Sequence, residues 1–409
     1  MLLESNSAAP RLLSPVETAS VLQAREGLAF MDSVTAQGQA FSLIASEPQE
    51  IYQGNIFEDT CALRQVLKEH QQTPVGDPGV PSSGLFGWVG FDGQYVFGRY
   101  ENCSAYQHDT QSWLDVSNHL HPATALHREG RVPPAAIVFE PQMDKATFCE
   151  LVRRAQRYIE AGDIYQVNLS YPWKAAWPEG LNSWAFYERL REASPTPYGA
   201  YFNLRGTQVF SASPECFIRI SGRHIVTRPI KGTRPRGDSM DSDARYATEL
   251  MTSPKERAEL IMITDLERND IGQVCEFGSV HVSELLKLER YAQVQHLVST
   301  VEGTLRQDVD QFDAFMACFP GGSISGAPKK RALEIIRELE PHQRGLYTGA
   351  IGYFGFNGES QFSIAIRTAW RTGNTVQFHT GAGIVADSDP EREWEETQHK
   401  AAGLLQAAV

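Results

Sequence analysis

A lysine flanked by arginines is the first group in this sequence that could do covalent chemistry. Lys231 lies within residues 229–237, which read PIKGTRPRG and contain two prolines and two glycines. Proline lacks an amide donor and glycine adds conformational freedom, so we predict a shaped loop here and not a helix or a central strand. Arg228, Arg234 and Arg236 crowd the lysine with positive charge, which can lower the pKa of an amine toward its nucleophilic neutral form. A solvated basic turn explains the same residues.

Two pairs of glutamates have a spacing that suits a metal site. Glu256 and Glu259, and again Glu393 and Glu396, are three residues apart in segments that we predict to be helical. This spacing puts both carboxylates of a pair on one helix face. Two such helices can form an oxygen-only site suited to Mg²⁺, which binds one or two protein carboxylates and leaves positions for substrate and water. Capping after Ser253 would also account for Glu256, and a surface ion pair for Glu259.

A third candidate is the small-residue segment 319–329, FPGGSISGAPK, which leads into a predicted helix over 328–340. The start of a helix presents free N–H groups toward an anion. The Walker pattern GxxxxGK[ST] is absent, so phosphate binding is not implied.

The elements that must position these groups are short strands and amphipathic helices. We predict helices at 14–30, 144–161, 183–193, 241–251, 253–273, 311–317, 328–340 and 390–407, and strands at 41–45, 84–92, 135–140, 164–171, 198–204, 208–211, 216–221, 224–227, 279–285, 294–303, 350–356, 360–370 and 375–380. No βαβ unit with a GxGxxG turn appears, so a dinucleotide-binding fold has no support. The pattern of residues changes near residue 134, which predicts a boundary between residues 1–133 and residues 134–409.

Composition limits the function further. The formal charge of −13 and the pI near 5.4 disfavour nucleic acid and anionic membranes as partners, but small anionic ligands remain open. No apolar stretch approaches the roughly 20 residues that span a bilayer, and residues 1–10 do not resemble a signal peptide, so we expect a cytoplasmic enzyme.

The six cysteines form no CxxC pair and are expected to be reduced. Four histidines in the polar segment 102–133 could bind a metal or lie on a surface excursion: His108, His119, His121 and His127.

Several motifs together resemble the chorismate-utilising enzymes, in order along residues 134–409. They are SPECF (213–217), PIKGTRPRG (229–237), DLERND (265–270), HLVSTVEG (296–303), GGSISGAPKKRALEIIRELEP (321–341), RGLYTGAIGYF (344–354), SIAIRTA (363–369) and GAGIVADSDPEREWEETQHKA (381–401). In the N-terminal third, LLES (2–5) and FMDS (30–33) are similar to elements of the same family.

The resemblance implies one large α+β unit. Large antiparallel sheets would pack against each other with helices on the outside, and the chorismate site would lie deep between them. Residues 1–133 would add strands to this common body, and LLES resembles an element of the tryptophan-binding pocket of some relatives. Residues 134–409 would form the catalytic region.

Two positions indicate which nucleophile reaches chorismate. The relatives that add water resemble one another in having a lysine base where this chain has Gln166, and an amide cannot deprotonate water. Anthranilate synthases have alanine where this chain has Lys231, whose amine could attack C2 and form a covalent intermediate. The resemblance therefore implies that chorismate and ammonia give 4-amino-4-deoxychorismate, a precursor of 4-aminobenzoate and folate. An anthranilate synthase, or a non-catalytic chorismate- or tryptophan-binding protein, are the alternatives.

By the same resemblance, Lys231 is the nucleophile and Glu215 protonates the leaving 4-hydroxyl group. His296 corresponds to an acid/base position in relatives that eliminate pyruvate. Mg²⁺ would be bound by Glu259 and Glu396, with Glu256 and Glu393 as further carboxylates around it. The substrate would be held by backbone groups and by side chains that bind carboxylates, namely Gly232, Thr233, Gly381, Gly383, Tyr347, Arg367 and Lys400.

Ammonia needs a source. The sequence has no GxCxGxQ segment of a glutaminase nucleophile, so we expect ammonia to come from solution or from a separate glutamine amidotransferase subunit.

Overall fold

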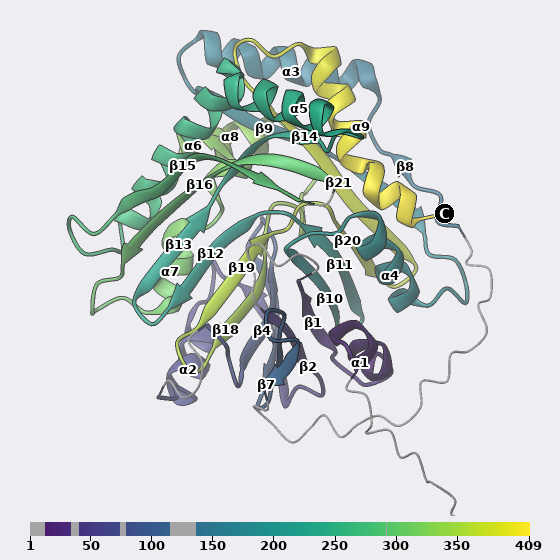
Figure 1. Cartoon of the computed structure of the whole chain (residues 1–409), viewed down its shortest axis with the longest axis vertical. Helices are drawn as coiled ribbons and strands as arrows, with labels where there is room; N and C mark the ends of the chain where they lie inside the picture. Colours follow the sequence, from purple (N-terminus) through teal and green to yellow (C-terminus); the bar gives the residue numbers. More distant parts are fainter. Residues whose placement is uncertain (1–12, 34–40, 74–78, 115–135, 292) are drawn as a thin grey trace, which may run out of the picture.

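The computed structural model describes residues 13–33, 41–73, 79–114, 136–291 and 293–409. In this part of the chain, two large antiparallel sheets lie together and helices cover their outer faces (Figure 1). This is the α+β architecture that the resemblance implied.

The first sheet has eleven strands. In spatial order they are β17 (Gly326–Ala327), β9 (Gln166–Ala176), β21 (Thr375–Ile384), β20 (Thr368–Thr372), β11 (Thr207–Ser213), β10 (Tyr198–Leu204), β1 (Ala29–Asp32), β2 (Phe41–Ala45), β6 (Ser104–Gln107) and β7 (Ser112–Leu114), with β8 (Glu140–Pro141) beside β9. Strand β1 from the N-terminal third pairs with β10.

The second sheet has ten strands. They are β14 (Ile230–Pro235), β16 (Val294–Thr304), β13 (His224–Arg228), β12 (Cys216–Ser221), β19 (Ser360–Ile364), β18 (Ala350–Gly355), β4 (Gly84–Val89), β5 (Gln94–Tyr100) and β3 (Glu50–Asn55), with β15 (His281–Arg290) beside β16. Strand β4 pairs with β18, so N-terminal strands enter this sheet too.

The helices cover the sheets. They are α1 (Pro15–Leu22), α2 (Cys61–Glu69), α3 (Lys145–Glu160), α4 (Ser183–Ala193), α5 (Met240–Thr252), α6 (Pro254–Gly272), α7 (Gln311–Cys318), α8 (Lys329–Leu339) and α9 (Pro390–Ala407), with a short 3₁₀ helix, η1 (Gly322–Ile324). Helices α3, α5, α6, α8 and α9 gather at one end of the molecule, and α1 and α2 lie at the other (Figure 1). None of the described helices is both long enough and apolar enough to cross a membrane.

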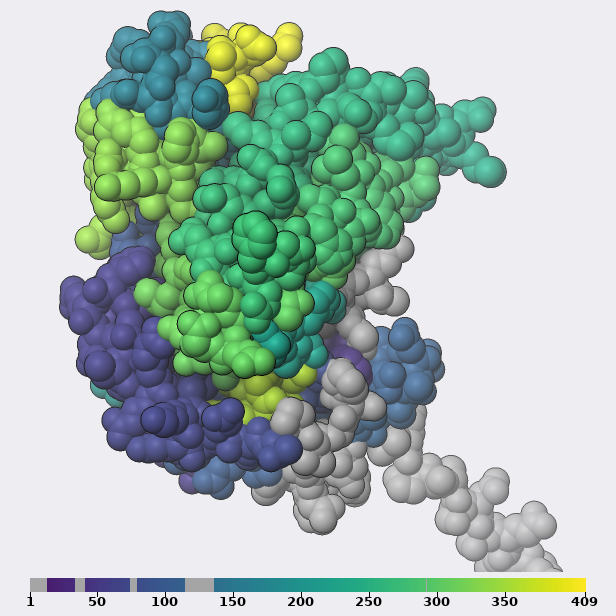
Figure 2. Space-filling view, turned by 90° about the vertical axis from the view of Figure 1, so that its left-hand side faces the viewer, coloured from purple at the N-terminus to yellow at the C-terminus, as the bar shows by residue number. Residues whose placement is uncertain are grey.

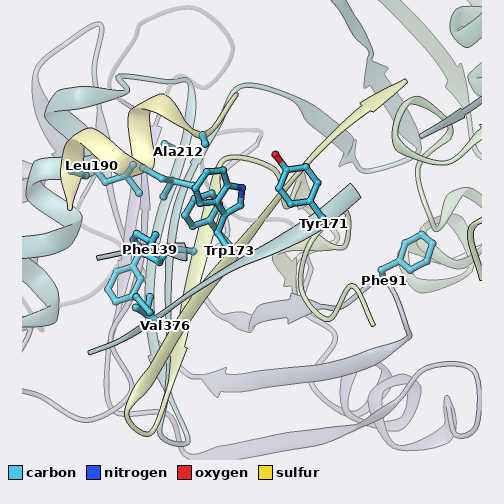
Figure 3. Close-up of a cluster of buried hydrophobic side chains, with 14 of the residues drawn as sticks. Phe91, Phe139, Tyr171, Trp173, Leu190, Ala212 and Val376 are labelled. Carbon is cyan, nitrogen blue, oxygen red and sulfur yellow. The ribbon is translucent and has the colours of Figure 1, made fainter. Parts of the chain in front are cut away.

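Apolar side chains fill both the space between the sheets and the space under the helices. Between the sheets, Trp88 of β4 meets Phe202 of β10 edge to face, with ring centres 6.0 Å apart. On the outer face of the first sheet, Phe139, Trp173 and Leu190 belong to the cluster drawn in Figure 3. In the space-filling view, purple N-terminal residues lie directly against green residues from the later part of the chain (Figure 2).

Glycines allow the central strands of the second sheet to approach closely. A Cβ atom at Gly87 would lie 1.9 Å from the carbonyl oxygen of Val96, and one at Gly352 would lie 1.9 Å from that of Gln361. No side chain fits at such distances, so the glycine-rich pattern in β4 reflects strand packing.

The structure corrects several predicted elements. The helix predicted at 14–30 ends at Leu22, and its last residues form β1. The strand predicted at 360–370 is two strands, β19 and β20, in different sheets. Of the strand predicted at 135–140, only the start of β8 at Glu140 is a strand in the described part. The prediction also missed the N-terminal strands β3, β5, β6 and β7 and the helix α2.

Candidate active site

Lys231 lies on a strand and not in the predicted loop. Strand β14 pairs with β16, and the register shifts between Lys231 and Thr233. Gly232 at this bulge has a φ of 74°, a left-handed conformation that glycine adopts easily. The two prolines of PIKGTRPRG fall just before the strand and at its last residue, where they disturb pairing least. The strand-breaking residues therefore frame a short bulged strand, and a bulge redirects the side chain next to it.

The Lys231 amino group faces polar groups from three other segments. Its Nζ atom donates to the carbonyl oxygen of Ser323 at 3.4 Å. A Cβ atom at Gly383 would lie 3.6 Å from this Nζ and 2.8 Å from Nε2 of Gln166. Gln166 is fully buried, and neither amide atom has a hydrogen-bond partner. Because an unsatisfied buried amide costs about 1–3 kcal/mol, a polar ligand bound here would be stabilised by completing these hydrogen bonds.

The three arginines near Lys231 do not crowd it with uncompensated charge. Each one pairs with a carboxylate: Arg228 with Glu289, Arg234 with Glu256 at 3.6 Å, and Arg236 with Asp243 at 2.6 Å. The arginine charges around the lysine are therefore paired with acidic side chains. The acids that interact with Lys231 include Glu215 and Glu259; burial raises the pKa of both, and the lysine opposes the increase.

Glu215 is a buried carboxyl group directly before β12. It is 5% exposed, and burial raises its pKa, while the Ser323 hydroxyl group and Lys231 oppose the increase. The neighbouring Cys216 and Phe217 are buried as well. A carboxyl group in such surroundings can keep its proton and act as a general acid.

His296 lies opposite Thr233 in the pairing of β14 and β16. The Thr233 hydroxyl group is 2.9 Å from Nδ1 of His296. Burial lowers the pKa of His296 to about 4, so the imidazole is neutral at pH 7. It can hold Thr233 in place by a hydrogen bond without carrying charge.

Strands β9 and β21 form one wall of the site. Gly381 lies opposite Ser170, and Gly383 lies opposite Asn168. A Cβ atom at Gly381 would lie 2.5 Å from the carbonyl oxygen of Leu169 and 2.8 Å from the Tyr347 hydroxyl oxygen. The two glycines thus allow Tyr347 and Gln166 to approach the backbone of β21, which leaves its backbone groups accessible to a ligand.

Positive charge gathers beside this wall. Lys400 donates to the carbonyl oxygen of Gly381 at 2.9 Å and forms an ion pair with Glu396 at 2.7 Å. Burial disfavours the charged form of Lys400, but Glu396 outweighs this effect and raises its pKa. Burial lowers the pKa of Arg367, which interacts electrostatically with Tyr347 and Glu396. Together these cations can bind a carboxylate of a ligand.

The two glutamate pairs come from the first two turns of facing helices. Ser253 caps α6 by accepting a hydrogen bond from the Glu256 N–H group, and Asp389 caps α9. Lys255 links the helices, because its Nζ atom lies 3.4 Å from Glu393 and 3.9 Å from Glu259. The structure therefore brings both predicted pairs to one place.

The four carboxylates differ in how well they fit a metal ion. Glu393 accepts a hydrogen bond from Ser388 at 2.7 Å, and Glu256 pairs with Arg234. Glu259 has a buried oxygen without a hydrogen-bond partner, and the Glu396 side chain is 49% exposed. Within the described ranges, no three His, Cys, Asp or Glu side chains are arranged to hold a metal ion alone. Glu259 and Glu396 fit an Mg²⁺ ion that takes its other ligands from substrate and water.

Two residues near the site were not singled out from the sequence. Ser323 contacts Lys231 through its carbonyl group, and its position in GGSIS was the available signal. Lys255 precedes Glu259 by one helical turn, a spacing that could have predicted the contact. Of the four histidines, His108 lies 2.8 Å from the Ser42 hydroxyl group, and the others fall outside the described residues. The LLES segment also falls outside them.

A bulged strand with a lysine, a buried acid and two facing carboxylate pairs define a site between two large sheets. The family model of chorismate binding enzymes matches residues 18–406, and the chain belongs to this family.

Known relatives include both kinds of synthase considered above. The chain is 48% identical over 269 residues to anthranilate synthase component 1 of Thermus thermophilus, covering 66% of this chain and 58% of the relative. It is 44% identical over 275 residues to aminodeoxychorismate synthase component 1 of Bacillus subtilis, covering 67% and 58%. The alignments thus span about three fifths of these curated relatives. Anthranilate synthase component I of Streptococcus pneumoniae has a similar structure, with a TM-score of 0.80, 27% identity, and coverage of 98% of this chain and 100% of that one.

Proposed function

We propose that this protein converts chorismate and ammonia to 4-amino-4-deoxychorismate, with Lys231 as the nucleophile. The observation that carries the proposal is the position of the Lys231 amine. It interacts with the buried acid Glu215 and lies beside Gln166, which cannot act as a base toward water. An amine and a protonated carboxyl group at one site are the two groups that such a substitution needs.

The proposed reaction has two steps. First, the Lys231 nitrogen bonds to C2 of chorismate, both ring double bonds shift (C1=C2 to C1=C6, and C5=C6 to C4=C5), and the C4–O bond breaks as Glu215 gives its proton to the departing hydroxyl group, which leaves as water. Second, ammonia bonds to C4, both double bonds shift back, and the Lys231 nitrogen leaves C2. The new C4 ammonium group returns one proton to Glu215. The balance is chorismate plus ammonia to 4-amino-4-deoxychorismate plus water.

The other site residues hold the substrate. Tyr347, Arg367 and Lys400 bind carboxylate groups, and the backbone at Gly232, Thr233, Gly381 and Gly383 contacts the ring and its substituents. Glu259 and Glu396 would hold Mg²⁺, with Glu256 and Glu393 nearby, and the bound ion would neutralise a substrate carboxylate. His296 stays neutral and positions Thr233.

Ammonia is supplied from solution or by a glutamine amidotransferase subunit. The product would feed synthesis of 4-aminobenzoate and folate. Anthranilate synthesis is the second candidate, because the Thermus thermophilus anthranilate synthase component is as similar to this chain as the Bacillus subtilis aminodeoxychorismate synthase component.

Mass spectrometry of the products separates these candidates. The purified protein is incubated with chorismate, Mg²⁺ and an ammonium salt, and the products are compared with a reaction that lacks ammonium. We expect 4-amino-4-deoxychorismate. Anthranilate, detected by mass and fluorescence, would overturn the proposal in favour of the second candidate, and unchanged chorismate would overturn both.

A further inference from the structure

A buried ion pair lies behind the proposed site. Glu340 follows α8, and Arg344 lies four residues later; their side chains are 2% and 1% exposed. The guanidinium group donates two hydrogen bonds to the carboxylate, from Nε at 2.9 Å and from Nη2 at 2.7 Å. A buried pair of this kind is weak evidence for stability, because desolvation offsets much of the attraction. Its other contacts therefore indicate what it does.

The remaining donors of Arg344 reach three segments that form the site. The Nη1 atom donates to the carbonyl oxygen of Ile324 at 3.3 Å and to the Thr348 hydroxyl group at 3.1 Å. The Nη2 atom donates to the carbonyl oxygen of Asn168 at 2.7 Å. Ile324 directly follows Ser323, whose carbonyl group contacts Lys231. Thr348 directly follows Tyr347, and Asn168 lies two residues from Gln166 on β9.

Glu340, the other member of the ion pair, also binds strand β9. Its Oε1 atom accepts from the Ser170 N–H group at 2.8 Å and from the Ser170 hydroxyl group at 3.0 Å. Ser170 lies opposite Gly381 in the pairing of β9 and β21. The guanidinium group itself lies 4.6 Å from the ring centre of Phe91 and 5.7 Å from that of Tyr347. Phe91 is set apart from the rest of the apolar cluster in Figure 3.

We propose that Arg344, oriented by Glu340, is a positioning residue. It holds the Ser323 carbonyl group, the start of strand β9 with Gln166, and Tyr347 at fixed distances from one another. Arginine suits this task because it offers five N–H donors in a rigid planar fork, whereas lysine offers three donors on a single nitrogen atom. The inference rests on the proposed function, since it concerns the site that binds chorismate. It adds a residue that acts only through others and touches no reacting atom.

The first test is Arg344→Lys, which keeps the charge and removes the fork. Displacing site groups by about 1 Å can cost on the order of 10²-fold in rate, so we expect kcat for chorismate consumption to fall at least about tenfold. We expect KM to change less than kcat, because the groups that bind the substrate carboxylates remain present. The matched control is Arg191→Lys, which weakens the ion pair with the buried Asp32. This control should lower the melting temperature and leave kcat unchanged.

A second variant separates positioning from stability. Replacing a buried ion pair by apolar residues of similar volume is often neutral or stabilising. Glu340→Leu/Arg344→Met should therefore retain cooperative thermal unfolding and still lose kcat. A kcat within twofold of wild type in a folded variant would overturn the inference. Failure of both variants to fold would assign the pair to folding alone and would also overturn it.

The two proposals can fail separately. The variants are compared with the wild-type protein by chorismate consumption, whichever amino product forms. Anthranilate formation by the wild type would overturn the proposed product and leave the comparison at Arg344 valid.

Discussion

The Nζ atom of Lys231 and the carbonyl oxygen of Ser323 lie 3.4 Å apart and connect β14 to the segment around η1. The contact joins two motifs that are 92 residues apart in the sequence. In this position the lysine amino group lies near Gly383 and Gln166. In the proposed reaction, the lysine is therefore oriented by a backbone carbonyl group before substrate binds, which reduces the ordering that the reaction requires.

Replacing Lys231 by alanine tests the covalent step. Lys231→Ala removes the only amine that the proposed mechanism uses, so we expect 4-amino-4-deoxychorismate formation to fall on the order of 10³-fold or more. Anthranilate should then become detectable, because ammonia could attack C2 directly. Product formation is measured by mass spectrometry with saturating ammonium. Lys174→Ala on the exposed side of β9 is the control. Wild-type rates in Lys231→Ala would exclude a covalent intermediate.

The metal prediction has a readout that does not depend on turnover. Glu259→Gln/Glu396→Gln should reduce Mg²⁺ affinity, because an amide is a weaker ligand than a carboxylate for a hard cation. Isothermal titration calorimetry with Mg²⁺ in the presence of chorismate measures the change, and we expect at least about a tenfold loss. Glu391→Gln changes an exposed carboxylate on α9 that pairs with Lys145, and it should leave affinity unchanged. Equal affinities in the wild type and the double variant would remove these two ligands.

A second buried acid lies close to Glu215. Glu267 on α6 is 7% exposed and accepts a hydrogen bond from the Thr227 hydroxyl group. Burial and the nearby Glu215 and Asp270 carboxyl groups together raise its pKa to about 8, while the Thr227 hydroxyl group and Lys329 oppose the increase. Glu267, Asp270 and Thr227, with Gly322 and Cys318, line a cavity of about 10 Å³. Such a volume holds at most about one water molecule.

Glu267→Gln should change how stability depends on pH. The pKa of Glu267 rises from 4.5 to about 8 on folding. Between these values the folded protein keeps a proton that the unfolded chain releases, so its contribution is complete below pH 4.5 and is lost as the pH rises to 8. The neutral amide removes this loss. We therefore expect the variant to gain stability relative to wild type from pH 5 to pH 8 in urea unfolding experiments.

The control for this prediction is Asp265→Asn, which changes an exposed carboxylate on the same helix. Its stability difference from wild type should be nearly constant over this pH range. If the stability difference between Glu267→Gln and wild type were also constant over this pH range, the Glu267 carboxyl group would already be ionised in the folded protein.

The sequence predicted the elements of residues 134–409 better than those of residues 1–133. Helices such as 183–193 and 390–407 have clear caps and periodicity, and the structure has the same bounds. Strands β3 and β5 were missed because their burial does not alternate regularly. The paired glutamates could be predicted from helical spacing. The pairing of Arg228, Arg234 and Arg236 could not, because Glu289, Glu256 and Asp243 reach them through tertiary contacts.

The place of Lys231 in the sheet has an evolutionary consequence. In the described part of the chain, β14 has one strand partner, and the lysine side chain is only partly buried. Truncating such a side chain leaves no large cavity, so the change to alanine should alter the folding free energy little. A lineage could therefore exchange one amination of chorismate for another by a single substitution, without first acquiring compensating changes in the core.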